Sequence, residues 1–199
     1  MISAASGNGL VASLTFDDGP NGATTERLLD FLAEKSIRAT FCVIGENVDA
    51  PGGAQVLRRI VADGHLLANH TTSFADMGEW GAEEIERDLR ENLEIIRRAL
   101  GDPSHGVPYF RAPNGRWGRT SEVAARLGMA SLAVINTIDD WRTQDVATLT
   151  ENLRAAIRAG ELVLAHDGGG DRNGTVDAVI AVVTERLAEG WRFTLPEAP

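Results

Sequence analysis

The sequence predicts an α/β fold, a distorted (β/α) barrel of the (β/α)7 type in a single domain. Seven short apolar runs, rich in β-branched and aromatic residues, are separated by longer segments of helical period. Strands that alternate with helices pair in parallel through right-handed crossovers, and about seven of them can curl into a barrel. The chain has 199 residues, of which 43% are hydrophobic, and this is enough for one substantial core. We therefore expect residues 1–199 to form one domain.

Each strand is expected where an apolar run is bounded by turn residues or by a charged segment. In chain order the runs are LVASLTF (10–16), RATFCVIG (38–45), HLLANHT (65–71), PYFRAP (108–113), MASLAVINTI (129–138), ELVLAHD (161–167) and WRFTL (191–195). The segments between them place apolar residues at three- and four-residue spacing, as amphipathic helices do. These predicted helices cover 24–35, 53–63, 82–100, 119–127, 147–158 and 174–190. The clearest apolar stripe is formed by Ile85, Leu89, Leu93, Ile96 and Leu100.

The composition excludes several classes of protein. A formal net charge of −10 argues against nucleic acid or an anionic membrane as partner, because both are bound by clustered lysines and arginines. Cys42 is the only cysteine, so no internal disulfide can form, and its apolar run places it in the core. The N-terminal segment MISAASGNGLVASL lacks the basic and apolar regions of a signal peptide. As written, the chain is expected to be cytoplasmic, or secreted if a leader was removed from it.

Ionisable side chains collect where five of the seven apolar runs end. They are Asp17 and Asp18, His70, Arg111, Asp139 and Asp140, and His166 and Asp167. In barrels of alternating strands and helices the active site lies at the carboxyl ends of the strands, so these groups should converge. Carboxylate and imidazole can bind a divalent cation, while a further carboxylate and imidazole can act as base and acid. The sequence therefore predicts a hydrolytic site.

Five motifs resemble those of the polysaccharide deacetylase family, also called the NodB homology domain or carbohydrate esterase family four. They are TFDDGP, NHTTSFADM, FRAPNG, NTIDDW and LVLAHD, in the family's order over residues 15–167. The family's distorted (β/α) barrel agrees with the strand count made above. The resemblance implies one catalytic domain over 1–199 and metal-dependent hydrolysis of acetyl groups, usually N-acetyl on amino sugars and sometimes O-acetyl on xylan.

The resemblance implies a role for each matching residue. Asp17 is the general base, and Arg111 pairs with it and lowers its pKa. Asp18 and His70 bind a divalent metal, which in this family is usually zinc. His166 is the general acid for the leaving amine, and Asp140 holds its imidazole.

The substrate-binding residues follow from the same motifs. The backbone N–H of Asn114 stabilises the oxyanion, next to Pro113 in the same motif. Trp141 and Leu164 wall the pocket for the acetyl methyl group.

The sequence departs from the family pattern at the metal site. Phe74 stands four positions after His70, where the family has a second histidine. A zinc site usually has three protein ligands and a water, whereas Asp18 and His70 supply two, so we expect weak metal binding. Asn114 replaces a common tyrosine and Thr137 a common aspartate, which suggests an unusual sugar acceptor.

Several alternatives stay open from the sequence. The leading substrate is an N-acetyl amino sugar, in an oligosaccharide or in a small molecule such as a glycosylated natural product. An O-acetyl carbohydrate esterase, a metal-free cyclic-amide hydrolase and a sugar-binding pseudoenzyme are the alternatives. Roles for His65, His105, Trp80 and Trp117 and the oligomeric state are left undecided.

Overall fold

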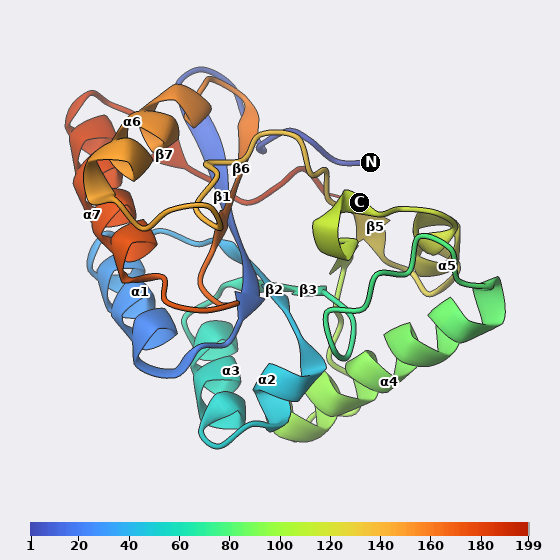
Figure 1. Cartoon of the computed structure of the whole chain (residues 1–199). Helices are drawn as coiled ribbons and strands as arrows, with labels where there is room; N and C mark the ends of the chain where they lie inside the picture. Colours follow the sequence, from blue (N-terminus) through green and yellow to red (C-terminus); the bar gives the residue numbers. More distant parts are fainter. Residues whose placement is uncertain (199) are drawn as a thin grey trace.

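The computed structural model describes residues 1–198 and has the predicted architecture, a curled parallel sheet surrounded by helices (Figure 1). Its seven strands are β1 (Val11–Gly19), β2 (Thr40–Val43), β3 (Leu66–Asn69), β4 (Tyr109–Phe110), β5 (Ala130–Ser131), β6 (Glu161–His166) and β7 (Arg192–Phe193). The strand order is β5-β4-β3-β2-β1-β6, and β7 pairs with the beginning of β1. Every strand pair is parallel. The prediction of a distorted (β/α)7-type barrel is confirmed.

Seven helices cover the outside of the sheet, and six of them match predicted segments. They are α1 (Gly22–Glu34), α2 (Gly45–Asp49), α3 (Gly53–Ala62), α4 (Ala82–Leu100), α5 (Thr120–Arg126), α6 (Val146–Ala156) and α7 (Asn173–Ala188). The unpredicted helix is α2, whose five residues are too short to show a helical period. Within residues 1–198, no helix is both long and apolar enough to span a bilayer.

Strand β1 is the centre of the sheet, and all nine of its residues are buried. One of its edges pairs with β6 from Ala12 to Asp17, and the other pairs with β2 from Thr15 to Gly19. The register with β2 shifts between Asp17 and Gly19, and Asp18 has a φ of 70°. Strict alternation would send two neighbouring side chains to opposite faces of the strand, and a bulge breaks that alternation. This bulge explains how Asp17 and Asp18 both reach the same pocket.

The predicted strand over 129–138 is wrong for most of its length. Regular pairing ends at Ser131, and only isolated bridges continue the sheet, from Ile2 to Leu132 and from Thr137 to Leu164. The Asn136 side chain donates instead to the carbonyls of Ala156 and Leu162, at 2.9 and 3.2 Å. This side chain thus ties the segment to the end of α6 and to β6. The barrel therefore closes only loosely between β5 and β6.

Helix α4 holds the loop after β3 through polar groups on its buried face. Asn92 Nδ2 donates to Asn69 Oδ1 at 2.8 Å, and Asn69 Oδ1 also accepts from the backbone N of Thr71 at 3.0 Å. Asp88 accepts hydrogen bonds from the backbone N and the hydroxyl of Thr72. These contacts fix the segment that follows His70.

Candidate active site

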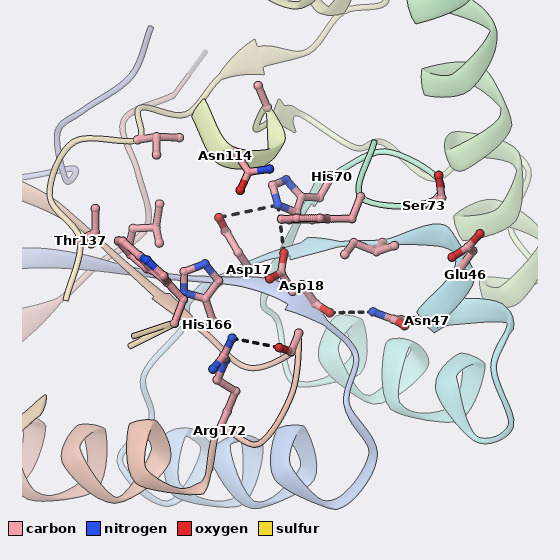
Figure 2. A pocket seen from close by; sticks show the side chains of 17 residues that line it. Asp17, Asp18, Glu46, Asn47, His70, Ser73, Asn114, Thr137, His166 and Arg172 are labelled. Carbon is pink, nitrogen blue, oxygen red and sulfur yellow. Dashed lines mark hydrogen bonds and ion pairs between the residues drawn. The ribbon is translucent and has the colours of Figure 1, made fainter. Parts of the chain in front are cut away.

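A pocket of about 740 Å³ opens at the carboxyl ends of the strands (Figure 2). Its walls are formed by Asp17, Asp18, Ile44, Glu46, Asn47, His70, Ser73, Phe74, Ala112, Asn114, Val134, Thr137, Trp141, Leu164, His166, Gly169 and Arg172. Seven of the ten predicted site residues are among them. Arg111 and Asp140 are fully buried, and each supports a pocket residue from behind. Pro113 is buried too, and it does not line the pocket.

Asp17 is held as a carboxylate by a buried arginine. Arg111 Nη1 donates to Asp17 Oδ1 at 2.6 Å and to Thr15 Oγ1 at 2.8 Å, and the arginine has no exposed surface. Burial would raise the pKa of Asp17, but the charge of Arg111 is the main effect that opposes it, and the pKa is lowered. Asp17 is therefore ionised at neutral pH and can accept a proton.

His166 and Asp140 form a buried pair on the other side of the pocket. His166 Nδ1 lies 2.7 Å from Asp140 Oδ1, and the backbone N of His166 donates to Asp140 Oδ2 at 2.8 Å. Because a carboxylate only accepts, Nδ1 carries a proton, and Nε2, which carries the second proton of the imidazolium, faces the pocket. Burial would lower the pKa of His166, but the hydrogen bond to Asp140 and the charges of Asp140, Asp17 and Asp18 raise it. These properties suit a general acid.

His70 and Asp18 face each other at the centre of the pocket. His70 Nδ1 lies 2.7 Å from the carbonyl oxygen of Arg111, so Nδ1 carries a proton, because a carbonyl only accepts. Nε2 of the neutral ring therefore points a lone pair at Asp18 Oδ1, 3.2 Å away, and at Asp17 Oδ2, 3.9 Å away. Asp18 Oδ1 is buried and has no hydrogen-bond partner among the described residues. A lone pair facing carboxylate oxygens needs a positive charge, so the pair fits a divalent cation with two protein ligands.

Phe74 lies beside His70 and Asp18, at the position where the family pattern has a second histidine. Its ring meets the His70 ring edge-on, with 5.9 Å between the centroids, and 39% of the residue is exposed. Its φ of 59° is unusual for an aromatic residue. No group of three or more His, Cys, Asp or Glu residues able to hold a metal occurs in residues 1–198. Among the described residues, Phe74 therefore adds no ligand atom beside Asp18 and His70.

The remaining predicted residues form the rim and one wall of the pocket. Trp141 is half exposed, and its ring lies edge-on to His166 with 5.7 Å between the centroids. Leu164 is buried in the wall below. Asn114 lies in a single 3₁₀ turn (Pro113–Gly115) with a φ of 55°. Pro113 begins that turn, and so it shapes the rim without lining the pocket.

The sequence did not predict Asn47 and Arg172, two pocket residues that lie away from the ends of the apolar runs. Asn47 Nδ2 donates to the backbone carbonyl of Asp18 at 2.8 Å, which fixes the bulge of β1 (Figure 2). Arg172 reaches the pocket from the loop before α7. Neither residue ends an apolar run, and the only local signal for Arg172 is its place in the glycine-rich segment DGGGDRNG (167–174). Contacts that depend on the tertiary fold leave little trace in the local sequence.

Asp167 is fully buried and directly follows β6. Its Oδ2 accepts from Thr25 Oγ1 at 2.5 Å, and its Oδ1 has no partner among the described residues. Burial, with the nearby charges of Asp18 and Asp17, raises the pKa of Asp167 to about 7. A Cβ on Gly19 would lie 2.3 Å from Asp167 Oδ2, so only glycine fits at that position of the TFDDGP motif.

The four residues left undecided do not line the pocket. His65 is buried and accepts from the backbone N of Ala39 at 3.0 Å, and burial lowers its pKa to about 4. His105 lies near Asp102 in the loop before β4. Trp80 and Trp117 pack against the main core. Cys42, predicted to lie in the core, is fully buried.

Comparison with known proteins agrees with the motifs. A family model described as polysaccharide deacetylase matches residues 5–132. A chitooligosaccharide deacetylase of Sinorhizobium fredii is 39% identical over 159 residues, covering 78% of this chain and 71% of that protein. Another, from Rhizobium leguminosarum bv. trifolii, is 36% identical over 200 residues, covering 92% and 89%. A crystal structure of a peptidoglycan N-acetylglucosamine deacetylase superposes with a TM-score of 0.86 at 26% identity, covering 98% of this chain and 89% of that one. The family match, the relatives and the motifs that converge on one pocket show that the chain belongs to the polysaccharide deacetylase family.

Proposed function

We propose that this protein hydrolyses the acetamide of an N-acetyl amino sugar and releases acetate and the free amine. The observation that carries the proposal is the pairing of Asp17 with Arg111 and of His166 with Asp140 on the walls of one pocket. One pair provides a base that is ionised, and the other provides an acid whose ring is held in one orientation. The names of the relatives support a substrate built from N-acetylglucosamine. The substrate is an oligosaccharide or a small molecule that carries such a sugar.

Hydrolysis begins with removal of a proton from water by Asp17. Arg111 keeps this carboxylate ionised, and its fully buried guanidinium holds the base in one position. The water then attacks the acetyl carbonyl carbon. The backbone N–H of Asn114 donates to the oxygen that becomes negative, a contribution typically worth ~3 kcal/mol. Trp141 and Leu164 enclose the acetyl methyl group.

The second half of the reaction is cleavage of the C–N bond. An amine anion is a poor leaving group, so its nitrogen must receive a proton as the bond breaks. Nε2 of His166 delivers that proton, and Asp140 stabilises the charged imidazole through Nδ1. A water proton thus passes to Asp17, and the His166 proton passes to the product amine.

We propose Asp18 and His70 as the two protein ligands of a divalent metal, with zinc as the expected ion. Such an ion polarises a carbonyl oxygen and lowers the pKa of bound water. The orphaned Asp18 Oδ1 and the lone pair of His70 Nε2 support this assignment. Because Phe74 supplies no ligand atom, waters or the substrate must complete the coordination, and metal binding should be weak.

Of the three alternative functions, two are less well supported, and the third has a specific observation in its favour. The buried Asp140–His166 pair is more than an O-acetyl esterase needs, since an alkoxide leaves more readily than an amine. A pseudoenzyme that only binds sugar would not need both the base and the acid with their partners. A metal-free cyclic-amide hydrolase is favoured by Phe74, which stands where the third ligand is expected.

The deciding experiment is a release assay for acetate and free amine. It uses N-acetylglucosamine, chitooligosaccharides and glycosides of N-acetylglucosamine, each before and after exhaustive chelation and after zinc is restored. Amine release that falls on chelation and returns with zinc supports the proposal. Full activity on an acetylated sugar after metal removal replaces it with metal-free hydrolysis, and release from O-acetyl xylan alone replaces it with the esterase. We also propose that residues 1–199 act as one catalytic domain, without nucleic acid or membrane as partner.

A further inference from the structure

Arg172 is a buried cation in the pocket wall that the reaction described above does not use. It lies directly before α7, at the end of the loop that follows His166, and only 7% of it is exposed. Figure 2 shows its side chain below His166, at the edge of the pocket. No acidic side chain among residues 1–198 forms an ion pair with it, although a buried charge usually has such a partner.

Carbonyl oxygens take the place of an acidic partner. Arg172 Nε donates to the carbonyl of Gly168 at 2.8 Å, and Nη2 donates to that of Gly169 at 3.1 Å. Nη1 donates to the carbonyls of Asp140 at 3.2 Å and of Asp171 at 3.3 Å. A guanidinium has five N–H groups, so four of them are used on the protein's own backbone. Arg172 is therefore built to hold protein segments rather than a substrate.

The two segments that Arg172 joins carry the two members of the acid pair. Asp140 belongs to the loop between β5 and α6, whereas Gly168 and Gly169 directly follow β6, which ends at His166. The Asp140 carbonyl also accepts from Gln144 Nε2 at 2.8 Å. Its carboxylate accepts from Thr175 Oγ1 at 3.0 Å, from the first turn of α7. Asp140 is thus fixed through its backbone and its side chain at once.

The same arginine lies near the proposed metal ligand. A Cβ on Gly169 would lie 2.6 Å from Asp18 Oδ2 and 3.4 Å from Arg172 Nη2. The φ of Gly169 is 74°, a conformation that favours glycine. The glycine loop therefore passes directly between Asp18 and the guanidinium, and Arg172 fixes that loop through the Gly169 carbonyl.

We propose that Arg172 is a positioning residue for the general acid: it ties the Asp140 loop to the loop after His166, so that the Asp140 carboxylate stays aligned with His166 Nδ1. This inference rests on the proposed function where it is tested by deacetylation kinetics, but its test by NMR titration of His166 is independent of that function. Removal of Arg172 should loosen the hydrogen bond between Asp140 and His166. The imidazolium of His166 then loses part of its stabilisation, and the charges of Asp17 and Asp18, which also act on His166, stay in place.

The test compares Arg172→Met and Arg172→Lys with matched changes at Arg186. Arg186 lies on α7, the helix that Arg172 directly precedes, and donates to the carbonyl of Arg154 at 3.0 Å, away from the pocket. The His166 ring is titrated by NMR in each full-length variant, and kcat and KM are measured against pH on an N-acetylglucosamine oligosaccharide. For Arg172→Met we expect a lower His166 pKa, a basic limb of kcat shifted to lower pH and a kcat about 10–100-fold lower, the range typical of lost supporting contacts. KM should change by less than about threefold if the loss lies in the chemical step.

Lysine can donate to the carbonyls but lacks the planar fork, so Arg172→Lys should recover part of the loss. The inference is overturned if His166 titrates in Arg172→Met as it does in Arg186→Met. It is also overturned if kcat falls with an unchanged pH profile. If the methionine variant does not fold, Arg172→Lys and Arg172→Gln carry the same comparison. If the native protein releases no acetate, the proposed function fails while the NMR titration still decides the role of Arg172.

Discussion

Replacement of Arg111 by methionine should destabilise the protein. It should also reverse the sign of the pH dependence that the buried Asp17 gives to the free energy of unfolding. Methionine roughly keeps the length of the side chain but leaves a carboxylate unpaired, 2.6 Å from where Nη1 was. Breaking a buried ion pair in this way typically costs 3–5 kcal/mol, because the remaining charge has no compensation. For a domain of this size that loss lowers the Tm by about 6–20 °C at pH 7.

The sign of the pH dependence gives a sharper test. In the native protein the pKa of Asp17 is lowered, so its contribution to stability is present above the unfolded pKa of ~3.9 and is lost as the pH falls. In Arg111→Met burial dominates and raises the Asp17 pKa above the unfolded value. The contribution of Asp17 then favours the folded state at low pH and is lost as the pH rises. The acidic limb of kcat/KM should move to higher pH as well.

Urea unfolding from pH 4 to pH 8, with pH–rate profiles, measures both effects. The control is Arg98→Met, which removes the exposed ion pair between Arg98 Nη2 and Asp49 and should cost only about 0–1 kcal/mol. A loss below about 1 kcal/mol in Arg111→Met, or an acidic limb that coincides with the native one, would refute the role given to Arg111.

Three further outcomes are expected. Asp17→Asn and His166→Ala should each lower the rate of amine release by about 10²–10⁴ with the fold intact by circular dichroism, and near-native rates in both would exclude the assigned base and acid. Phe74→His should tighten metal binding at least ~10-fold, measured by calorimetry, and should make activity less sensitive to mild chelation. Phe74→Leu is the control, and an unchanged metal Kd in Phe74→His would remove this position from the metal site. The pKa of Asp167 is raised to about 7, so this group stabilises the fold below pH ~4 and loses that contribution as the pH rises towards 7. Asp167→Asn should therefore gain stability relative to the native protein between pH 4 and pH 8, and parallel urea midpoints across that range would contradict the pKa.

The sequence predicted the position of the site better than its internal geometry. Strand ends could be read from the apolar runs, and the rule that barrel sites lie at those ends placed Asp17, His70 and His166 together. The sequence could not show that Asp17 and Asp18 both enter one pocket, because this depends on the bulge of β1 and on the φ of Asp18. Local backbone irregularities of this kind have weak sequence signals.

The errors in the predicted fold have physical causes. The run over 129–138 has the apolar composition of a strand, but its regular pairing ends at Ser131, and Asn136 instead ties the segment to carbonyls of α6 and β6 through its side chain. Asp88 and Asn92 lie on the buried face of α4 next to the predicted apolar stripe, where they hold the loop after β3. The proposed role of Arg172 could not be foreseen, because it depends on the carbonyl of Asp140, 32 residues away in the sequence.

The register of the central strand pair limits how this enzyme can change. Asp17 and His166 are direct partners in the parallel ladder of β1 and β6, so the backbone itself sets the separation of the proposed base and the proposed acid. Inserting or deleting one residue in either strand would turn one of the two side chains to the opposite face of the sheet. The side chains of Phe74 and Trp141 belong to neither strand, and substitutions there leave the register of β1 and β6 unchanged. New sugar specificities should therefore be obtained by substitution at such rim positions, while the lengths of β1 and β6 are kept unchanged.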